Sequence, residues 1–223
     1  AKPIIGGKEV SGKEEPSVNP ANISEVVGVC HQASGEHVDK AIELSVAAQP
    51  SWDRLGADER ARILNRAADL YEQHRDELID LCVREGGRTI PDCISELREA
   101  VDFMRYYGAQ AKKHFGEPIV LPGPTGERNT YSMRGKGVFI AISPWNFPLA
   151  IFTGQVTAAL AAGNAVLAKP AAPTTIIAYR AIQLLHEAGV PPDVLHFVPC
   201  GGRLMGERGV ADPRIAGVVF TGS

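Results

Sequence analysis

Residues 143–148 read SPWNFP and separate two apolar segments of the chain. Before them, residues 138–142 read VFIAI, a short uninterrupted apolar run that is typical of a buried strand. After them, residues 149–162 are apolar over a length that favours a buried helix. A turn between a buried strand and a buried helix, at the strand's carboxyl end, is where open parallel sheets hold ligands. Asn146 therefore occupies a position that favours ligand binding.

The same alternation of strand and helix continues to the end of the sequence. Further strands are expected at residues 165–168, 194–198 and 218–220, with helices at 174–188 and 203–208. Short, continuously apolar strands that alternate with helices predict an α/β fold, in which helices flank a Rossmann-like parallel sheet. Right-handed crossovers place the carboxyl ends of all strands on one side. Four turns should therefore build one site there: residues 143–146, 169–172, 199–202 and 221–223.

The first half of the chain has a different pattern, with two hairpins followed by helices. Hairpins are expected at residues 4–10, around Gly6-Gly7, and across 17–29. Helical spacing begins after Ser34, and one long amphipathic helix is predicted over 58–84, ended by Gly86-Gly87. A further helix is predicted over 91–114. The charged residues of these helices are expected on solvated faces: Arg60, Arg62, Glu72, Arg75 and Asp76.

Residues 116–136 do not read as a core element. This stretch contains Pro118, Pro122, Gly123, Pro124 and Gly126, and then alternating polar and apolar residues. We expect an extended arm or an edge hairpin here.

The composition narrows the class of protein. A hydrophobic content of 44% and a charged content of 22% are ordinary for a globular protein. The 23 basic and 26 acidic residues give a net charge of −3 without a basic cluster, which argues against a nucleic-acid partner. The sequence has no apolar run of membrane-spanning length and no signal-peptide core at its start. We therefore expect a cytoplasmic protein without a membrane span.

The cysteines and histidines do not suggest a metal site. Cys30, Cys82, Cys93 and Cys200 form no C-x-x-C pair, and the six histidines show no helical pairing. Cys82 falls on an apolar helical face and is expected to be a small core residue.

Individual residues of the predicted edge allow more than one interpretation. Gly202 to Gly206 begins a helix directly after a strand, where free amides favour a phosphate, although glycines are common in such turns for backbone reasons. Lys169 is suited to bind a ribose or a phosphate, or is simply the first exposed residue after a strand. Asn146, taken alone, is better explained as a helix cap.

Taken together, four motifs resemble the aldehyde dehydrogenase superfamily: SPWNFP at 143–148, AKPA at 168–171, G-x-x-x-G at 202–206 and FTGS at 220–223. Their order and intervals match that family's cofactor domain. The resemblance implies that residues 1–223 form an incomplete NAD(P)-binding domain, that 116–136 contribute to an oligomerisation flap, and that the full-length protein is a homo-oligomer.

A narrower resemblance rests on two longer stretches. SPWNFPLAIFTGQ at 143–155 and VREGGRTIPDCISELREAVDFMRYYGAQA at 83–111 are similar to the dehydrogenase module of bifunctional proline-utilisation flavoenzymes. That module oxidises L-glutamate γ-semialdehyde, the open form of Δ1-pyrroline-5-carboxylate, to L-glutamate with NAD. FAD would belong only to a separate proline dehydrogenase domain. The alternatives are another semialdehyde dehydrogenase, for example for succinate semialdehyde, and a non-catalytic nucleotide-binding module.

The resemblance also implies roles for residues of this sequence. Asn146 would be catalytic, donating its amide to the oxygen of the attacked aldehyde. The other predicted site residues would all bind the cofactor: Ile142, Ser143, Pro144 and Trp145 along its channel, Lys169, Ala171 and Ala172 near the adenosine ribose, Gly202 and Gly206 at the adenine and pyrophosphate, and Phe220, Gly222 and Ser223 toward the nicotinamide.

Two departures from the family pattern qualify these expectations. Position 172 is often a glutamate that binds both ribose hydroxyls, and alanine there makes NADP acceptable as well as NAD. The family's nucleophilic cysteine and general base lie beyond the position of Ser223, and none of the four cysteines matches the nucleophile's motif. The chain is therefore expected to be an N-terminal half that lacks activity by itself.

Overall fold

The structure is a computed structural model that describes residues 1–222. Ser223, one of the predicted cofactor residues, lies outside the described residues.

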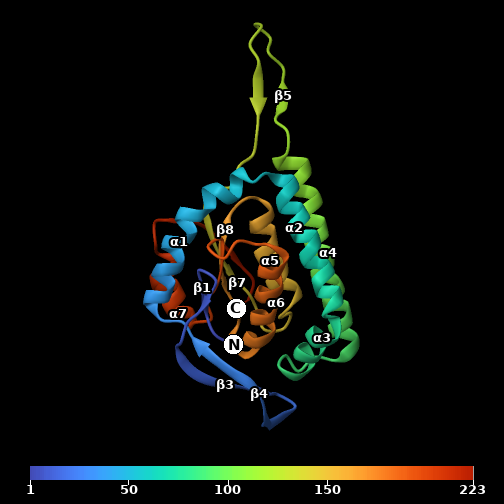
Figure 1. Ribbon diagram of the computed structural model, residues 1–223, viewed down its shortest axis with the longest axis vertical. Helices are drawn as coiled ribbons and strands as arrows, with labels where there is room; N and C mark the ends of the chain where they lie inside the picture. The colour runs from blue at the N-terminus through green and yellow to red at the C-terminus, as the bar shows by residue number, and fades with distance from the viewer. Residues whose placement is uncertain (223) are drawn as a thin grey trace.

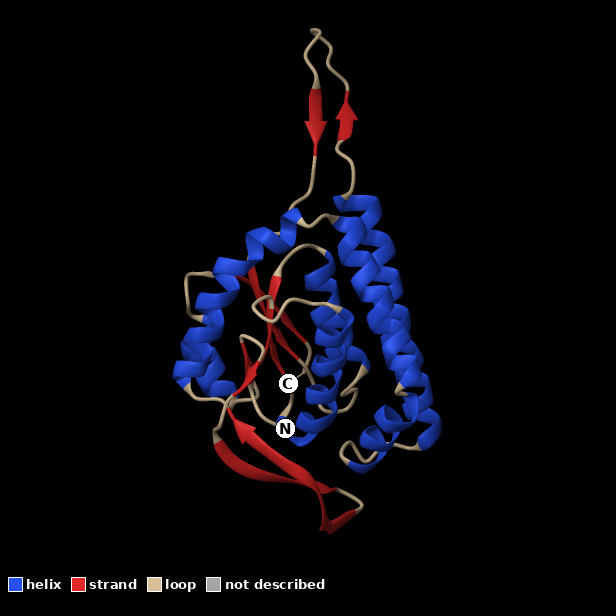
Figure 2. Ribbon diagram, in the orientation of Figure 1, coloured by secondary structure: helices blue, strands red, loops and turns tan. Residues whose placement is uncertain are grey.

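A six-stranded sheet in the order β10-β7-β8-β9-β1-β2 forms the centre of the molecule (Figures 1 and 2). The four predicted strands pair in parallel: β7 (Val138–Ile142), β8 (Ala165–Lys169), β9 (Leu195–Phe197) and β10 (Ile215–Phe220). The prediction of an α/β fold with a parallel sheet is confirmed. The first hairpin, β1 (Ile4–Ile5) and β2 (Lys8–Glu9), extends the sheet in antiparallel fashion beside β9, an addition that its local pattern did not predict.

Helices cover both faces of this sheet (Figure 2). On one face lies α1 (Gly35–Arg54), whose N-cap is Ser34. On the other lie α5 (Ala150–Ala161) and α6 (Thr175–Ala188), which follows the short 3-10 turn η1 (Ala172–Thr174). Every residue of β8 is buried because it has a strand on each side and helices above and below. This explains why the strand sequences are continuously apolar.

The long helix predicted over 58–84 is two helices, α2 (Ala57–Gln73) and α3 (Arg75–Arg84). They are separated at His74, whose φ of −99° and ψ of 21° leave the helical region. The apolar periodicity runs across the break because both helices pack against α4 (Ile90–Phe115) and α6. Periodicity alone cannot register a change of direction at one residue.

Arg60 corrects the expectation of a fully solvated charged face. Its side chain is only 1% exposed, and the guanidinium donates to the carbonyls of Ala161 at 3.0 Å, Trp52 at 3.3 Å and Asp53 at 2.8 Å. The last carbonyls of a helix lack intrahelical partners. Arg60 thus caps the carboxyl ends of α1 and α5 together.

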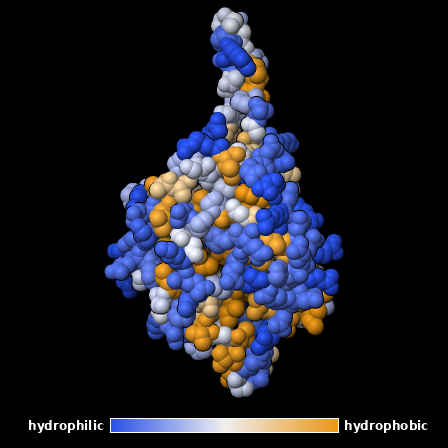
Figure 3. All heavy atoms as spheres, viewed as in Figure 1, coloured by the Kyte–Doolittle hydropathy of each residue, from blue (hydrophilic) through white to orange (hydrophobic). Residues whose placement is uncertain are grey.

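Two hairpins extend from this body (Figure 1). The first pairs β3 (Lys13–Asn19) with β4 (Asn22–Gln32). The second is the arm predicted at 116–136, in which β5 (Ile119–Leu121) pairs with β6 (Asn129–Tyr131). Ile119, Val120 and Leu121 are exposed on the arm, and Figure 3 shows hydrophobic atoms along it.

The helix predicted over 203–208 is a single turn, α7 (Gly202–Leu204), that continues as a π-helical segment, η2 (Met205–Val210). Within residues 1–222, each helix is too short or too polar to cross a membrane.

Candidate functional site

The carboxyl ends of the parallel strands meet at one edge of the sheet. The amide of Ser143 donates to the carbonyl of Lys169 at 3.2 Å, and the amide of Thr221 donates to the carbonyl of Ile142 at 3.1 Å. The turns after β7, β8 and β10 are therefore joined by backbone hydrogen bonds, and the segment 199–202 follows β9 on the same side.

A polar relay that is buried at Ser143 fixes the relative positions of two of these turns. The Ser143 hydroxyl donates to Oε1 of Gln155 at 2.7 Å, and Nε2 of Gln155 donates to the Thr221 hydroxyl at 2.9 Å. Gln155 lies on α5, so this helix holds the ends of β7 and β10 together. Sequence reasoning missed Gln155, although a glutamine inside an otherwise apolar helix is a signal for a buried hydrogen bond.

The SPWNFP turn presents Trp145 and Asn146 outward, whereas Ser143 is buried. Pro144 is buried and Ile142 half-buried, whereas Trp145 is 58% exposed and Asn146 is exposed. The N-cap of α5 is Leu149, and no side-chain cap bond is formed there within residues 1–222. The interpretation of Asn146 as the cap of this helix is therefore wrong.

The amides that start α5 bind a carboxylate from another helix. Oε1 of Glu96, on α4, accepts from the amides of Leu149 at 2.7 Å and Ala150 at 3.1 Å. Burial raises the pKa of Glu96, and the two amide hydrogen bonds act in the opposite direction. A negative group is favourable at a helix N-terminus because the free N–H groups point toward it.

Arg88 contacts the same turn from the loop before α4. It donates a hydrogen bond from Nη1 to the backbone carbonyl of Asn146, and its guanidinium carbon lies 4.4 Å from the centre of the Phe147 ring. Its Nε is 3.7 Å from Oε2 of Glu96. Sequence reasoning missed Arg88 and Glu96 because nothing local marks a contact made across more than fifty residues.

The interpretation of Lys169 as simply the first exposed residue after a strand is wrong. It is only 8% exposed, and its ammonium donates to the carbonyl of Pro170 at 3.0 Å. Burial lowers its pKa. Nearby, burial raises the pKa of the Cys200 thiol to about 11, and the same cause raises the pKa of Cys30 to about 11. These two thiols stay protonated at neutral pH and are poor nucleophiles.

The remaining predicted cofactor residues lie at the surface of this edge. Ala171 is half-buried, and Ala172, Phe220 and Gly222 are exposed. Gly202 and Gly206 are also exposed, and a Cβ added to either would meet no atom within 4 Å among residues 1–222. The backbone there is open to a ligand, but this openness does not by itself require glycine.

Trp145 and Ala172 share a cavity of about 580 Å³ with residues from the N-terminal half. Its wall includes Ser17 of β3 and the Glu85-Gly86 pair that follows α3. The carboxylate of Glu85 is already engaged there: Oε1 accepts from the Ser17 hydroxyl at 2.9 Å and the Ile176 amide at 2.8 Å, and Oε2 from the Ile177 amide at 2.8 Å. Burial raises the pKa of Glu85.

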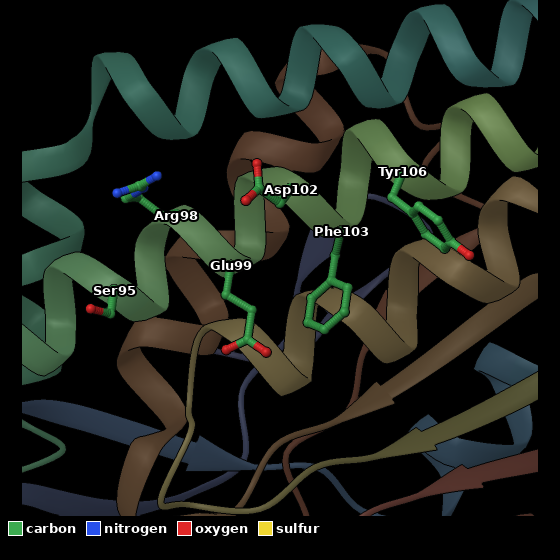
Figure 4. A pocket seen from close by; sticks show the side chains of 6 residues that line it. All are labelled: Ser95, Arg98, Glu99, Asp102, Phe103 and Tyr106. Carbon is green, nitrogen blue, oxygen red and sulfur yellow. The ribbon is translucent and has the colours of Figure 1, made fainter.

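A second concavity lies on α4, away from the predicted cofactor residues. It is lined by six residues of that helix, and Figure 4 shows Glu99 and Phe103 pointing from α4 in one direction and Arg98 in another. Phe103 packs against α5 so closely that a Cβ on Gly154 would lie 2.9 Å from its ring. In the part of the chain that the structure describes, no group of three or more His, Cys, Asp or Glu residues could hold a metal ion.

Comparisons with known proteins agree with this geometry. Residues 8–223 match the model of the "Aldehyde dehydrogenase family". The whole chain is 45% identical to the "Bifunctional protein PutA" of Salmonella typhimurium, of which it covers 16%. Over 221 residues, or 99% of the chain, it is 39% identical to the "1-pyrroline-5-carboxylate dehydrogenase" of Geobacillus thermodenitrificans, of which it covers 43%.

A solved structure of 1-pyrroline-5-carboxylate dehydrogenase from Thermus with bound NAD superposes with a TM-score of 0.92 at 34% identity, covering 97% of this chain and 42% of that one. The chain therefore spans less than half the length of each of these relatives. The family match nevertheless extends over nearly all of its residues, and the chain belongs to the aldehyde dehydrogenase family.

Proposed function

We propose that this chain supplies the cofactor-binding part of an NAD-dependent enzyme that oxidises L-glutamate γ-semialdehyde to L-glutamate, with Asn146 as the oxyanion donor. The observation that carries the proposal is the position of Asn146: exposed at the carboxyl edge of β7, on a supported turn, and relieved of any capping role. The substrate is proposed from the relatives named 1-pyrroline-5-carboxylate dehydrogenase.

The chemistry explains why an amide donor is useful at this position. When a nucleophile adds to the carbonyl carbon of an aldehyde, the electron pair of the C=O bond moves to oxygen and an oxyanion develops. Nδ2 of Asn146 can donate a hydrogen bond to that oxygen, and a donor held in place needs no reorganisation as the charge forms. A bound NAD would supply the acceptor for the hydride that the aldehyde carbon loses on oxidation to the carboxylic acid.

The buried and exposed residues around this edge together fit a dinucleotide. Ile142, Ser143, Pro144 and Trp145 would line its channel, Lys169, Ala171 and Ala172 would face the adenosine ribose, and Gly202, Gly206, Phe220 and Gly222 would lie along the pyrophosphate and nicotinamide. The open backbone at Gly202 and Gly206 supports this assignment. Lys169 would have to exchange its bond to Pro170 for a ribose or phosphate oxygen.

The choice between NAD and NADP rests on the surroundings of Ala172. Glu85 lines the same cavity, but its oxygens are bound to Ser17 and to the amides at the start of α6. Its oxygens are therefore already engaged, and it is not free to hold both ribose hydroxyls as a glutamate at position 172 would. We propose NAD as the main cofactor, because the structure of the Thermus relative holds bound NAD, with measurable use of NADP. The exposed arm at 116–136 would contribute to a homo-oligomer.

The test is steady-state kinetics of the purified full-length protein with L-glutamate γ-semialdehyde and with succinate semialdehyde, each with NAD and with NADP. We expect the highest kcat/KM for glutamate γ-semialdehyde with NAD. A preference for succinate semialdehyde would contradict the substrate assignment, and cofactor binding without turnover of either aldehyde would contradict the enzymatic role.

A further inference from the structure

The turn that carries Asn146 is held at both ends by side chains from one distant segment. At its end, the amides of Leu149 and Ala150 bind Oε1 of the buried Glu96. At its beginning, the carbonyl of Asn146 accepts from Arg88, whose guanidinium also lies over the Phe147 ring. These contacts use the backbone of the turn and the Phe147 ring, and none of them uses the Asn146 side chain.

The two supporting side chains also face each other. Nε of Arg88 and Oε2 of Glu96 are 3.7 Å apart, and within residues 1–222 neither atom has a hydrogen-bond partner. Both are buried, so their charges attract through a medium that screens poorly. Arg88 lies in the loop before α4 and Glu96 in the second turn of α4. Together they bind the backbone at residues 146 and 150, the two ends of the turn.

We propose that Glu96 is a positioning residue for the Asn146 amide, acting through the backbone of residues 146–150 with Arg88 as its partner. The inference rests on the proposed oxyanion role of Asn146. A misplacement of about 1 Å at a reacting centre can cost on the order of 100-fold in rate. Loss of the Glu96 carboxylate frees the amides at the start of α5, and the aim of the Asn146 amide changes with them.

The chain provides a matched control in Glu85. This residue is also a buried carboxylate that accepts from two amides at a helix N-terminus, those of Ile176 and Ile177 in α6. Helix α6 begins at Thr175 and carries no residue that we propose to contact the aldehyde. Glu85→Ala and Glu96→Ala thus remove the same kind of interaction, but of the two carboxylates it is Glu96 that binds the backbone of the turn that bears Asn146.

The experiment is a double-mutant cycle on kcat in the full-length enzyme with L-glutamate γ-semialdehyde and NAD. We expect Glu96→Ala to lower kcat about 10-fold or more, and to have no further effect when Asn146 is already alanine. Glu85→Ala should change kcat by the same factor whether residue 146 is asparagine or alanine. Glu96→Gln should restore most of the activity, because its amide oxygen can still accept from Leu149 and Ala150.

The outcomes separate this inference from the proposed function. If Asn146→Ala has normal kcat, the oxyanion role is refuted. If Asn146→Ala is impaired but Glu96→Ala lowers kcat equally with and without Asn146, Glu96 acts independently and the positioning role is refuted. Should Glu96→Ala not fold, Glu96→Asp takes its place in the cycle. Its shorter side chain cannot reach both amides, and an unchanged kcat in this variant would also overturn the inference.

Discussion

Replacement of Asn146 by alanine should separate catalysis from stability. In the proposed role, the side-chain amide is one preorganised donor to the oxyanion, and loss of such a donor lowers kcat by about 100- to 1,000-fold, or roughly 2.7–4 kcal/mol of transition-state stabilisation. The structure adds a second expectation. Because α5 is capped by Glu96, the substitution should leave the free energy of unfolding within about 0.5 kcal/mol of the wild type.

Asn146→Asp is the companion variant. A carboxylate cannot donate a hydrogen bond and would repel the developing oxyanion, so kcat should fall further than with alanine. If Asn146 were a helix cap, aspartate would serve as well as asparagine, and only alanine would reduce stability, by about 1 kcal/mol. The oxyanion role therefore predicts that aspartate lowers kcat more than alanine does, whereas the capping role predicts that alanine lowers stability more than aspartate does.

The assays are NADH formation in the full-length enzyme, with the concentration of active sites determined separately, and thermal unfolding of each variant. The dissociation constant for NAD should change little, because the amide faces the aldehyde oxygen. A normal kcat for Asn146→Asp would refute the oxyanion role. A large loss of stability in Asn146→Ala with kcat preserved would restore the capping interpretation that the structure contradicts.

Three further predictions follow from other parts of the fold. Arg60→Ala should lower the free energy of unfolding by about 3 kcal/mol in denaturant titrations, because three helix-end carbonyls lose a charged donor inside the protein; a change below about 1 kcal/mol would contradict this. Burial lowers the pKa of His196 to about 4, from an ordinary 6.5, so between pH 6.5 and pH 4 the unfolded chain binds a proton on this residue that the folded chain does not. The free energy of unfolding should therefore fall by up to about 3 kcal/mol as the pH is lowered from 6.5 to 4. His196→Gln should remove that part of the pH dependence, and an unchanged pH profile of stability in this variant would contradict the prediction. Deletion of residues 119–131 should convert the proposed oligomer to smaller species in sedimentation measurements, without loss of the central fold. An unchanged number of subunits in the sedimenting particle would exclude the arm as a subunit contact.

The parallel sheet was predictable because its signals are local. Residues 138–142 are apolar at every position and end at Ser143-Pro144, and the strand observed there has the expected bounds. The same argument succeeded for β8, which is buried on both faces. The break at His74 could not be predicted in this way, since α2 and α3 each keep an apolar face and only the backbone dihedral angles of one residue depart from the helix.

The chemistry of the site was less accessible from the sequence than its location. Alternation of strands and helices placed Asn146 at the carboxyl edge of the sheet, but the partners of its turn are Arg88, in the loop before α4, and Glu96, in α4, and neither residue stands out in the sequence. Arg60 was misjudged for a related reason, because its partners are carbonyls of other helices and carry no signature in the sequence. Backbone acceptors and donors are present at every residue, so only the fold reveals which of them a charged side chain binds.

The proposed oxyanion donor, Asn146, and the residues that hold its turn, Arg88 and Glu96, are different residues, and the requirements of an oxyanion donor give a physical reason for this. A side chain that caps its own helix is drawn toward the helix amides and away from an incoming substrate. Here the cap comes from Glu96 on α4, and the carbonyl of Asn146 is held by Arg88, so the turn is fixed without using the Asn146 side chain. In the proposed role of Asn146, the rigidity that preorganisation demands is supplied by Arg88 and Glu96, to which we assign no contact with the aldehyde. Substitutions of Arg88 and Glu96 should accordingly affect the rate of the reaction more than the affinity for the cofactor, because both residues bind the backbone of this turn.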